Sequence, residues 1–245
     1  AVDVSNSMLA QDFEPSRLER TKFAIDRLTQ QLEQDRIGLI VFAGDAYMQL
    51  PITSDYVAAR SFAAQISPTM VSKQGTAIGA AIDLAASSFS SGSEGSRVIV
   101  VISDGENHED DALAAAKAAA EKGIRIYTIG IGTPEGAPIS IDGEFIKDEQ
   151  GDMVVSKLDE QMLEQIALTT GGAYIRATNR SLGLDEIVQK INEVEKKELT
   201  STVFEDFNEQ YQYLIGLALA LLLLEFAMLE RRSRLLARFN IFRKR

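Results

Sequence analysis

Three polar residues at every second position open the chain and set the chemistry to be explained. Asp3, Ser5 and Ser7 follow the apolar Ala1 and Val2 in AVDVSNS. An apolar start that runs into polar residues predicts a buried strand that ends in a polar loop. One carboxylate and two hydroxyls at the end of such a strand could begin a site for a hard cation, because hard cations prefer oxygen ligands.

Two later segments add groups of the same kind. Asp104 follows the apolar run of SRVIVVISDG, and Thr76 stands at the start of the Ala-rich segment 75–89. Because ligands of open α/β sheets bind at the carboxyl ends of the strands, we expect these groups to meet at one edge. The set of two carboxylates and three hydroxyls suits Mg²⁺ far better than zinc or copper, and Mn²⁺ and Ca²⁺ are other divalent candidates. The hydroxyls would bind the ion directly, the carboxylates would hold its waters, and at least one position would stay open. The predicted metal-binding residues are Asp3, Ser5, Ser7, Thr76 and Asp104.

The hydropathy pattern indicates the elements that must position these residues. Apolar, β-branched runs cover 36–44, 96–105 and 124–132, which favours strands buried on both faces of a parallel sheet. Segment 46–55 is predicted to turn back beside the first of these as an edge strand, because Pro51 is tolerated only at an edge. Strands that alternate with helices predict a doubly wound, mostly parallel α/β fold. Helices are expected from Ser16, over 75–89, 110–123 and 160–169, and from Leu184, with a further strand over 173–178.

Two segments carry more specific expectations. In the first expected helix, Ser16 and Glu19 have the spacing of a capping box. Residues 133–158 interrupt the alternation, and two short strand-like pieces around an acidic turn predict an exposed β-hairpin inserted there, with strands at Phe145–Lys147 and Met153–Val155. The apolar residues at roughly helical spacing in the first helix are Leu18, Phe23, Ile25, Leu28 and Leu32.

Composition excludes several classes of site. The 245 residues include no cysteine, so disulfides, thiol catalysis and cysteine-ligated zinc or iron–sulfur centres are excluded. The single histidine, His108, argues against a multi-histidine metal site. A net charge of −11 disfavours nucleic acid as a partner.

The C-terminal part of the chain is predicted to anchor it in a membrane. No polar residue occurs over 214–224, and the 19 residues of 211–229 give about 28 Å of helix, which just spans a hydrocarbon core of ~30 Å. Residues 230–245 contain seven Arg or Lys and one Glu, which predicts a cytoplasmic tail with the acidic domain across the membrane. The expected organisation is a folded domain over 1–196, a linker over 197–210, the transmembrane helix and the basic tail.

The polar residues resemble those of a known family. The DxSxS motif that begins at Asp3, the distant Thr76 and Asp104 in SDG resemble the metal-ion-dependent adhesion site (MIDAS) of von Willebrand factor A domains. In that family the two serines and the threonine coordinate the metal directly, while the aspartates act mainly through waters. The resemblance carries these roles to Ser5, Ser7 and Thr76, and to the two aspartates. SMLAQDFEPSRLERTK, GTPEGAPI, TGGAYIRAT and LTSTVFEDFNEQYQY further resemble the Bat (aerotolerance operon) family over essentially the whole chain.

The Bat resemblance implies a bacterial inner-membrane protein with a periplasmic A domain. Members of that family carry two more membrane helices before the A domain, which would lie upstream of residue 1. Partners in the family include other Bat proteins and a cytoplasmic MoxR-type AAA+ ATPase, and a partner's acidic side chain would fill the open metal position. The expected function is therefore a membrane-anchored, metal-dependent protein-binding module with no catalytic residue.

Several enzymatic alternatives use the same residues. The main alternative is a metal-assisted phosphatase or protease, which lacks a credible general base beside the metal. A Ser–His–Asp hydrolase could be drawn from Ser103 or Ser7 with His108 and Asp104, but no G-x-S-x-G elbow exists. A phosphoryl-accepting Asp3 would need a second aspartate where the chain has Ser5. IGIGTPEG misses the dinucleotide-loop spacing, and no P-loop motif is present.

Overall fold

The computed structural model of the chain describes residues 1–32, 35–90, 95–107, 109–141, 143–148, 150–178, 181–193 and 211–230. It divides into two compact units, Ala1–Glu193 and Val194–Arg245, which are described separately below.

Six strands form the central sheet of the first unit, in the order β10-β5-β4-β1-β2-β3. All neighbouring strands run parallel except β2 and β3, which are antiparallel. The predicted parallel sheet is confirmed, and so is the edge position of the strand that contains Pro51. The strands are β1 (Val2–Asp3), β2 (Ile37–Phe42), β3 (Ala46–Thr53), β4 (Arg97–Ser103), β5 (Ile124–Gly130) and β10 (Tyr174–Arg176).

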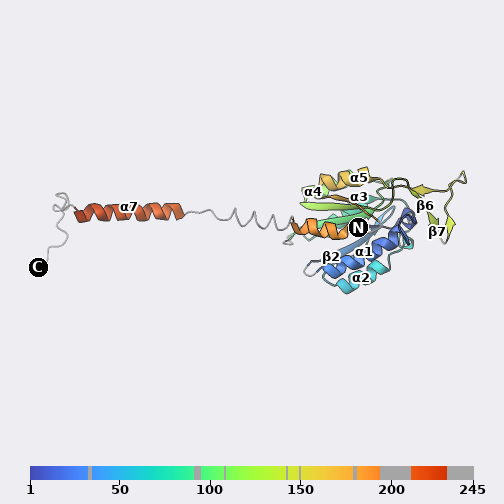
Figure 1. Ribbon diagram of the computed structural model, residues 1–245, viewed down its shortest axis with the longest axis horizontal. Helices are drawn as coiled ribbons and strands as arrows, with labels where there is room; N and C mark the ends of the chain where they lie inside the picture. Colours follow the sequence, from blue (N-terminus) through green and yellow to red (C-terminus); the bar gives the residue numbers. More distant parts are fainter. Residues whose placement is uncertain are drawn as a thin grey trace. The chain divides into compact units, whose positions relative to one another are not determined.

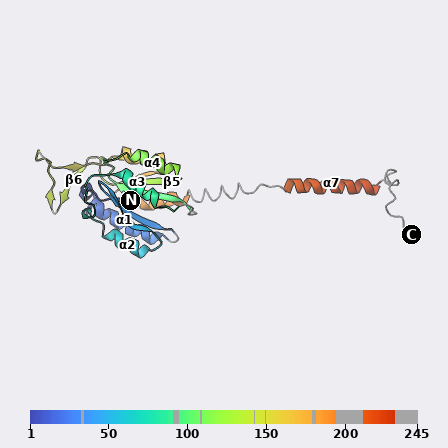
Figure 2. The same ribbon diagram turned by 180° about the vertical axis from the view of Figure 1, so that it is seen from behind.

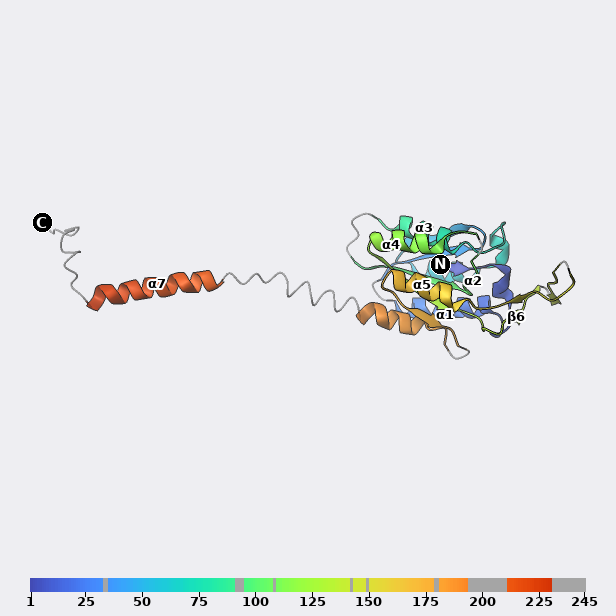
Figure 3. The ribbon, with the colours of Figure 1, turned by 90° about the horizontal axis from the view of Figure 1, so that it is seen from above.

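Helices cover both faces of this sheet (Figures 1 and 3). Helices α1 and α2 and the helical residues 184–193 contribute to the apolar core on one face. Helices α3, α4 and α5 contribute to the core on the other face, and the view from behind shows the same separation (Figure 2). The helices are α1 (Arg17–Gln31), α2 (Tyr56–Ala64), α3 (Ile78–Ser88), α4 (Ala112–Glu121) and α5 (Glu160–Thr169), with short 3-10 helices at Asn6–Leu9 and Pro68–Met70.

Strand β2 illustrates why the sheet must be covered on both sides. Val41 packs into the core on the α1 side, whereas Ile40 and Phe42 pack into the core on the α3 side. Successive side chains of a strand point to opposite faces, so a continuous apolar run fits only a sheet that is buried on both faces. The interpretation of the apolar runs as doubly buried strands is therefore confirmed.

Helix α1 confirms one expectation and corrects another. The Ser16 side chain accepts a hydrogen bond from the Glu19 N–H at 3.2 Å, as a capping residue should. Phe23, however, is 64% exposed, so its predicted place on the buried face was wrong. At 100° per residue, position 23 lies on the opposite side of the helix from the buried Leu18 and Ile25.

Helix α2 was not predicted from the sequence. Its N-cap is Asp55, whose side chain accepts a hydrogen bond from the Ala58 N–H. The helix buries only Ala59 and Ala63, while Val57 and Phe62 are exposed, so no large apolar residues on its buried face reveal a helical period.

The inserted segment 133–158 is a β arm that projects from the domain (Figure 3). Lys147 and Met153 pair as an antiparallel bridge, so the two predicted pieces face each other. The predicted strand bounds Phe145–Lys147 and Met153–Val155 were wrong, because the strands there are Glu144–Phe145 and Val155–Ser156 and each pairs with a different segment. The described residues of the predicted hairpin are exposed or half-buried, as expected, whereas Ile139 and Ser156 at the base of the arm are buried. The arm contains β6 (Ala137–Pro138) paired with β9 (Val155–Ser156), and β7 (Ser140–Ile141) paired with β8 (Glu144–Phe145).

In the second unit the structure describes one helix, α7 (Tyr211–Glu230). The chain over 211–229 is therefore helical, as predicted. Across the residues that the structure describes, however, no helix meets the length and apolar character required to cross a membrane, so the predicted transmembrane span is not found. The predicted linker 197–210 and tail 231–245 lie outside the described residues.

Candidate metal centre

The two aspartates of the candidate site come from adjacent central strands. Val2 of β1 pairs with Ile102 of β4 in parallel, so both strands end at the same edge of the sheet. Asp3 ends β1, and Asp104 directly follows β4. Both aspartates have no exposed surface. The fold therefore places two carboxylates at the carboxyl ends of neighbouring parallel strands, where ligands of such sheets bind.

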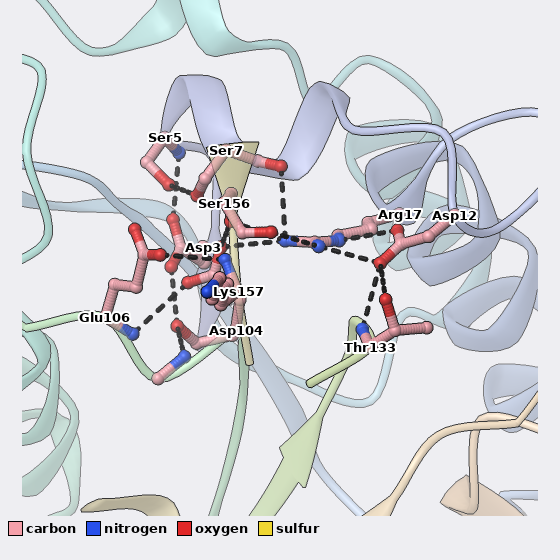
Figure 4. Close-up of polar contacts among 12 residues, drawn as sticks. Asp3, Ser5, Ser7, Asp12, Arg17, Asp104, Glu106, Thr133, Ser156 and Lys157 are labelled. Atoms are coloured by element: carbon pink, nitrogen blue, oxygen red, sulfur yellow. Dashed lines mark hydrogen bonds and ion pairs between the residues drawn. The ribbon is translucent and has the colours of Figure 1, made fainter. Parts of the chain in front are cut away.

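Serine residues lie around the Asp3 carboxylate (Figure 4). The Ser5 N–H donates to Asp3 Oδ1 at 2.8 Å, and the Ser103 hydroxyl donates to Asp3 Oδ2 at 2.6 Å. Ser5 Oγ and Ser7 Oγ lie 2.8 Å apart, because the 3-10 turn after β1 brings the second serine back beside the first. All three serines are buried. Asp3, Ser5 and Ser7 therefore form one cluster, as predicted, and Ser103 joins it as a hydroxyl that the prediction did not assign to a metal.

Burial makes the Asp3 carboxyl a weaker acid than an ordinary aspartate. Loss of solvation and, second, the negative charge of Asp104 raise the pKa of Asp3, hydrogen bonds from Ser103 and Ser5 lower it, and the net result is a pKa of about 7. Within the described residues, the hydrogen-bond partners of this carboxylate are neutral groups. An ionised Asp3 therefore lacks a balancing positive charge among its partners.

Thr76 is placed at the same edge by its loop. It is 4% exposed and lies just before α3. The next residue, Ala77, donates its N–H to the Ala43 carbonyl after β2, and the Gln74 side chain accepts the N–H of Asn6 in the serine loop. The Thr76 side chain itself makes no hydrogen bond to the other four predicted residues in the part of the chain described here. The structure therefore ties the Thr76 loop to the serine loop without joining Thr76 to the cluster.

A buried arginine that the sequence analysis did not identify lies beside Asp104. Arg17, the first residue of α1, has no exposed side-chain surface and donates from Nη1 to Asp104 Oδ2 at 3.0 Å. Its Nε and Nη2 donate to the two carboxylate oxygens of Asp12, both at 2.7 Å. This planar, two-bond geometry is the strong form of an ion pair. Arg17 therefore supplies one positive charge shared by two carboxylates.

The same arginine reaches the base of the β arm. Its Nη1 donates to Ser156 Oγ at 2.8 Å and its Nη2 to the Ser156 carbonyl at 3.2 Å. Ser156 in turn donates its hydroxyl to Asp104 Oδ2 at 3.0 Å. At the other end of the insertion, the N–H of Thr133 donates to Asp12 Oδ2 at 2.9 Å. Figure 4 shows the guanidinium between these two groups of residues.

Among the described residues, the structure adds no further catalytic group for the enzymatic alternatives. The Ser103 hydroxyl is held by Asp3 and accepts the Gly105 N–H at 3.0 Å. His108 lies outside the described residues. Within the described ranges, no cluster of three or more His, Cys, Asp or Glu residues could hold a metal ion. A cation at this edge would therefore need hydroxyl ligands in addition to carboxylates.

A doubly wound α/β sheet with these polar residues at its carboxyl edge is the arrangement expected of a von Willebrand factor A domain. Comparison with known protein families agrees. A family model of the von Willebrand factor type A domain matches residues 1–190, so the chain belongs to that family. Among solved structures it is similar to BatB, a conserved hypothetical protein from Bacteroides thetaiotaomicron, with 51% identity and a TM-score of 0.76 over 80% of this chain and 96% of that one. It is also similar to an aerotolerance-related membrane protein from Bacteroides fragilis NCTC 9343, solved with multiple mutations to serines, with 52% identity and a TM-score of 0.75 over 78% of this chain and 96% of that one.

Curated relatives extend beyond this chain. An uncharacterized protein of Borreliella burgdorferi is 30% identical over 230 residues, which cover 92% of this chain and 66% of that protein. A UPF0353 protein of Mycolicibacterium paratuberculosis is 29% identical over 243 residues, which cover 94% of this chain and 69% of that protein. The chain thus spans about two thirds of the length of these relatives.

One more distant structure shares the fold. Proximal thread matrix protein 1 of the mussel byssus, solved with a zinc-occupied MIDAS motif, is 16% identical and has a TM-score of 0.57 over 76% of this chain and 43% of that one.

Proposed function

We propose that the chain is a metal-dependent protein-binding module. Asp3, Ser5, Ser7, Thr76 and Asp104 would hold a divalent cation at the carboxyl edge of the sheet, and the cation would offer an open position to an acidic side chain of a partner protein. The chain would bind its partner without catalysing a reaction.

The observation that carries this proposal is the buried Asp3 carboxyl with neutral partners. A carboxylate in such a place is costly, and its raised pKa expresses that cost. A divalent cation would favour the ionised form and would suit the surrounding hydroxyl oxygens of Ser5 and Ser7. The donor chemistry of the residues therefore fits a hard divalent cation such as Mg²⁺. The zinc in the MIDAS motif of the mussel protein supports a divalent ion and leaves Mn²⁺, Ca²⁺ and Zn²⁺ to be compared with Mg²⁺.

Thermal unfolding of the full chain with and without divalent cations tests the proposal. A ligand that binds only the folded state adds about 2.7 kcal/mol at 100 times its Kd, which corresponds to about 5 to 11 °C for a domain of this size. Mg²⁺ should raise the melting temperature of the wild type and of Asp83→Ala, whose carboxylate is exposed on α3. It should not raise the melting temperature of Asp104→Ala. An equal response of all three proteins would contradict the assignment.

We further propose that the module acts at a bacterial inner membrane with its A domain in the periplasm, beside other Bat-type proteins and a cytoplasmic MoxR-type AAA+ ATPase. The name of the Bacteroides fragilis relative, an aerotolerance-related membrane protein, supports membrane association. The leucine side chains of α7 from Leu214 to Leu224 are 58–70% exposed, and an apolar surface of this kind is suited to lipid. Co-purification of the chain with membranes, and its release when residues 211–245 are removed, would test the attachment.

A further inference from the structure

The inserted β arm is fastened to the candidate metal edge at both of its ends. At its C-terminal end, Ser156 shares hydrogen bonds with Asp104 and Arg17. At its N-terminal end, Thr133 donates its N–H to Asp12 Oδ2 at 2.9 Å and its hydroxyl to the same oxygen at 3.2 Å. Arg17 holds Asp12 as well, so a single guanidinium links both ends of the arm.

Arg17 makes shorter and more numerous hydrogen bonds to Asp12 than to Asp104, the carboxylate that a cation would approach. Arg17 makes two hydrogen bonds of 2.7 Å to Asp12 but one of 3.0 Å to Asp104. Asp104 Oδ2 accepts from both Arg17 and Ser156, whereas its Oδ1 accepts only the Glu106 N–H, at 3.3 Å, among the described contacts. A cation drawn to Asp104 would repel the guanidinium and withdraw negative charge from the carboxylate, which weakens both hydrogen bonds to Oδ2.

We propose that cation binding at this edge is coupled to the β arm through Arg17 and Ser156, so that a bound cation loosens the base of the arm. This inference rests on the proposed function, since it requires a cation at Asp104. Arg17 acts here as a positioning residue, because it contacts Asp104 and the arm rather than the cation. By reciprocity, loss of the Ser156 hydrogen bond to Asp104 must raise the affinity for the cation.

Loosening the base of the arm would move an exposed apolar surface of the arm. The pairing of Ser140 with Phe145, of Lys147 with Met153 and of Pro138 with Val155 places these six residues on one face of the arm. Phe145, Met153 and Val155 are 52%, 56% and 46% exposed on that face. A shift at the base of the arm therefore displaces an exposed apolar face that begins beside the metal edge.

Amide hydrogen exchange and calorimetry on the full chain test the coupling. In the wild type, Mg²⁺ should bind by isothermal titration calorimetry, and peptides covering 137–141 and 153–158 should exchange about threefold faster with Mg²⁺ than without it. Ser156→Ala should lower the Mg²⁺ Kd by about threefold or more, because the competing hydrogen bond to Asp104 is gone, and should remove the effect of Mg²⁺ on arm exchange. The matched control is Ser140→Ala, in β7 of the same arm, which should keep the wild-type Kd and response.

The outcomes separate the two proposals. If the wild type binds no divalent cation, the proposed function fails and the coupling fails with it. If the wild type binds Mg²⁺ but arm exchange is unchanged or slower, only the coupling is overturned. A Ser156→Ala protein that keeps both the wild-type Kd and the wild-type exchange response would also overturn it, and so would weaker Mg²⁺ binding by a folded Ser156→Ala protein, whereas tighter binding together with loss of the exchange response would support it.

Discussion

Replacing Arg17 with methionine should cost the first unit a large part of its stability. The substitution preserves much of the side-chain length but removes the hydrogen bonds to Asp12, Asp104 and Ser156. It leaves Asp104 fully buried and Asp12 with a 7% exposed side chain, both without their arginine. Breaking a buried ion pair in this way costs about 3 to 5 kcal/mol. At about 2 to 4 °C per kcal/mol for a domain of this size, the melting temperature should fall by roughly 6 to 20 °C.

The experiment has a matched control on the same helix. Arg27 also pairs with an aspartate, Asp185, at 3.0 Å, but its side chain is 71% exposed. Arg27→Met should therefore change the free energy of unfolding by less than about 1 kcal/mol. Arg17→Lys should fall between the two, because an ammonium keeps the charge but loses the planar two-bond contact with Asp12. Urea denaturation at neutral pH without divalent cations measures all three variants. An Arg17→Met protein within about 1 kcal/mol of the wild type would show that the guanidinium is not the support of this site.

Three further outcomes follow from the same structure. Burial acts to raise the pKa of Asp12, but the hydrogen bonds and charge of Arg17 hold it below its ordinary value of 3.8, so its ionised form stabilises the fold above that pH. The stability advantage of the wild type over Asp12→Asn should therefore shrink as urea denaturation is carried from pH 7 down through pH 3, and a constant difference would contradict this. Replacing 143–152 with a short Gly/Ser linker should change stability by less than about 0.5 kcal/mol, because the described residues there are almost all exposed; a collapse on thermal unfolding would show that the tip of the arm packs into the core. Gly172→Ala should lower the melting temperature, since the added Cβ would lie 1.9 Å from the Ile126 carbonyl oxygen, and a melting temperature equal to that of the wild type would refute this close approach.

Local signals in the sequence were sufficient for most of the fold. The capping residue Ser16 marked the start of α1, and continuous apolar runs marked β2, β4 and β5, because each of these signals depends on neighbours in the chain. The Ala-rich α2 gave no such signal, since small residues fill the space between helix and sheet without a strong hydrophobic period. Phe23 misled the prediction because a large apolar residue was assigned to the core without testing its angle on the helix.

The residue that supports the candidate site, Arg17, was identified only in the structure. Arg17 stands among charged residues in PSRLERTK and has the composition of a solvated first turn. Its partners Asp104 and Ser156 lie 87 and 139 residues away, and pairings at that separation leave no mark in a single sequence. One signal was available: Arg17 is four and eight residues before Thr21 and Ile25, which share the buried face of α1. If helical phase is considered for charged residues as well as apolar ones, it places Arg17 on the buried face of α1.

The position of β1 also has a consequence for how the protein is made. This two-residue strand comes first in the sheet's sequence but lies between β2 and β4, so its second neighbour is synthesised last of the three. The hydroxyl of Ser103, which holds Asp3, is 100 residues further along, and at a translation rate of about 5 to 20 residues per second that distance takes about 5 to 20 s. During this interval the apolar residues of β1 have no β4 partner. The candidate metal site cannot assemble on the nascent chain until β4 has emerged, so an ion bound there would mark a β1 that has paired with both of its neighbours.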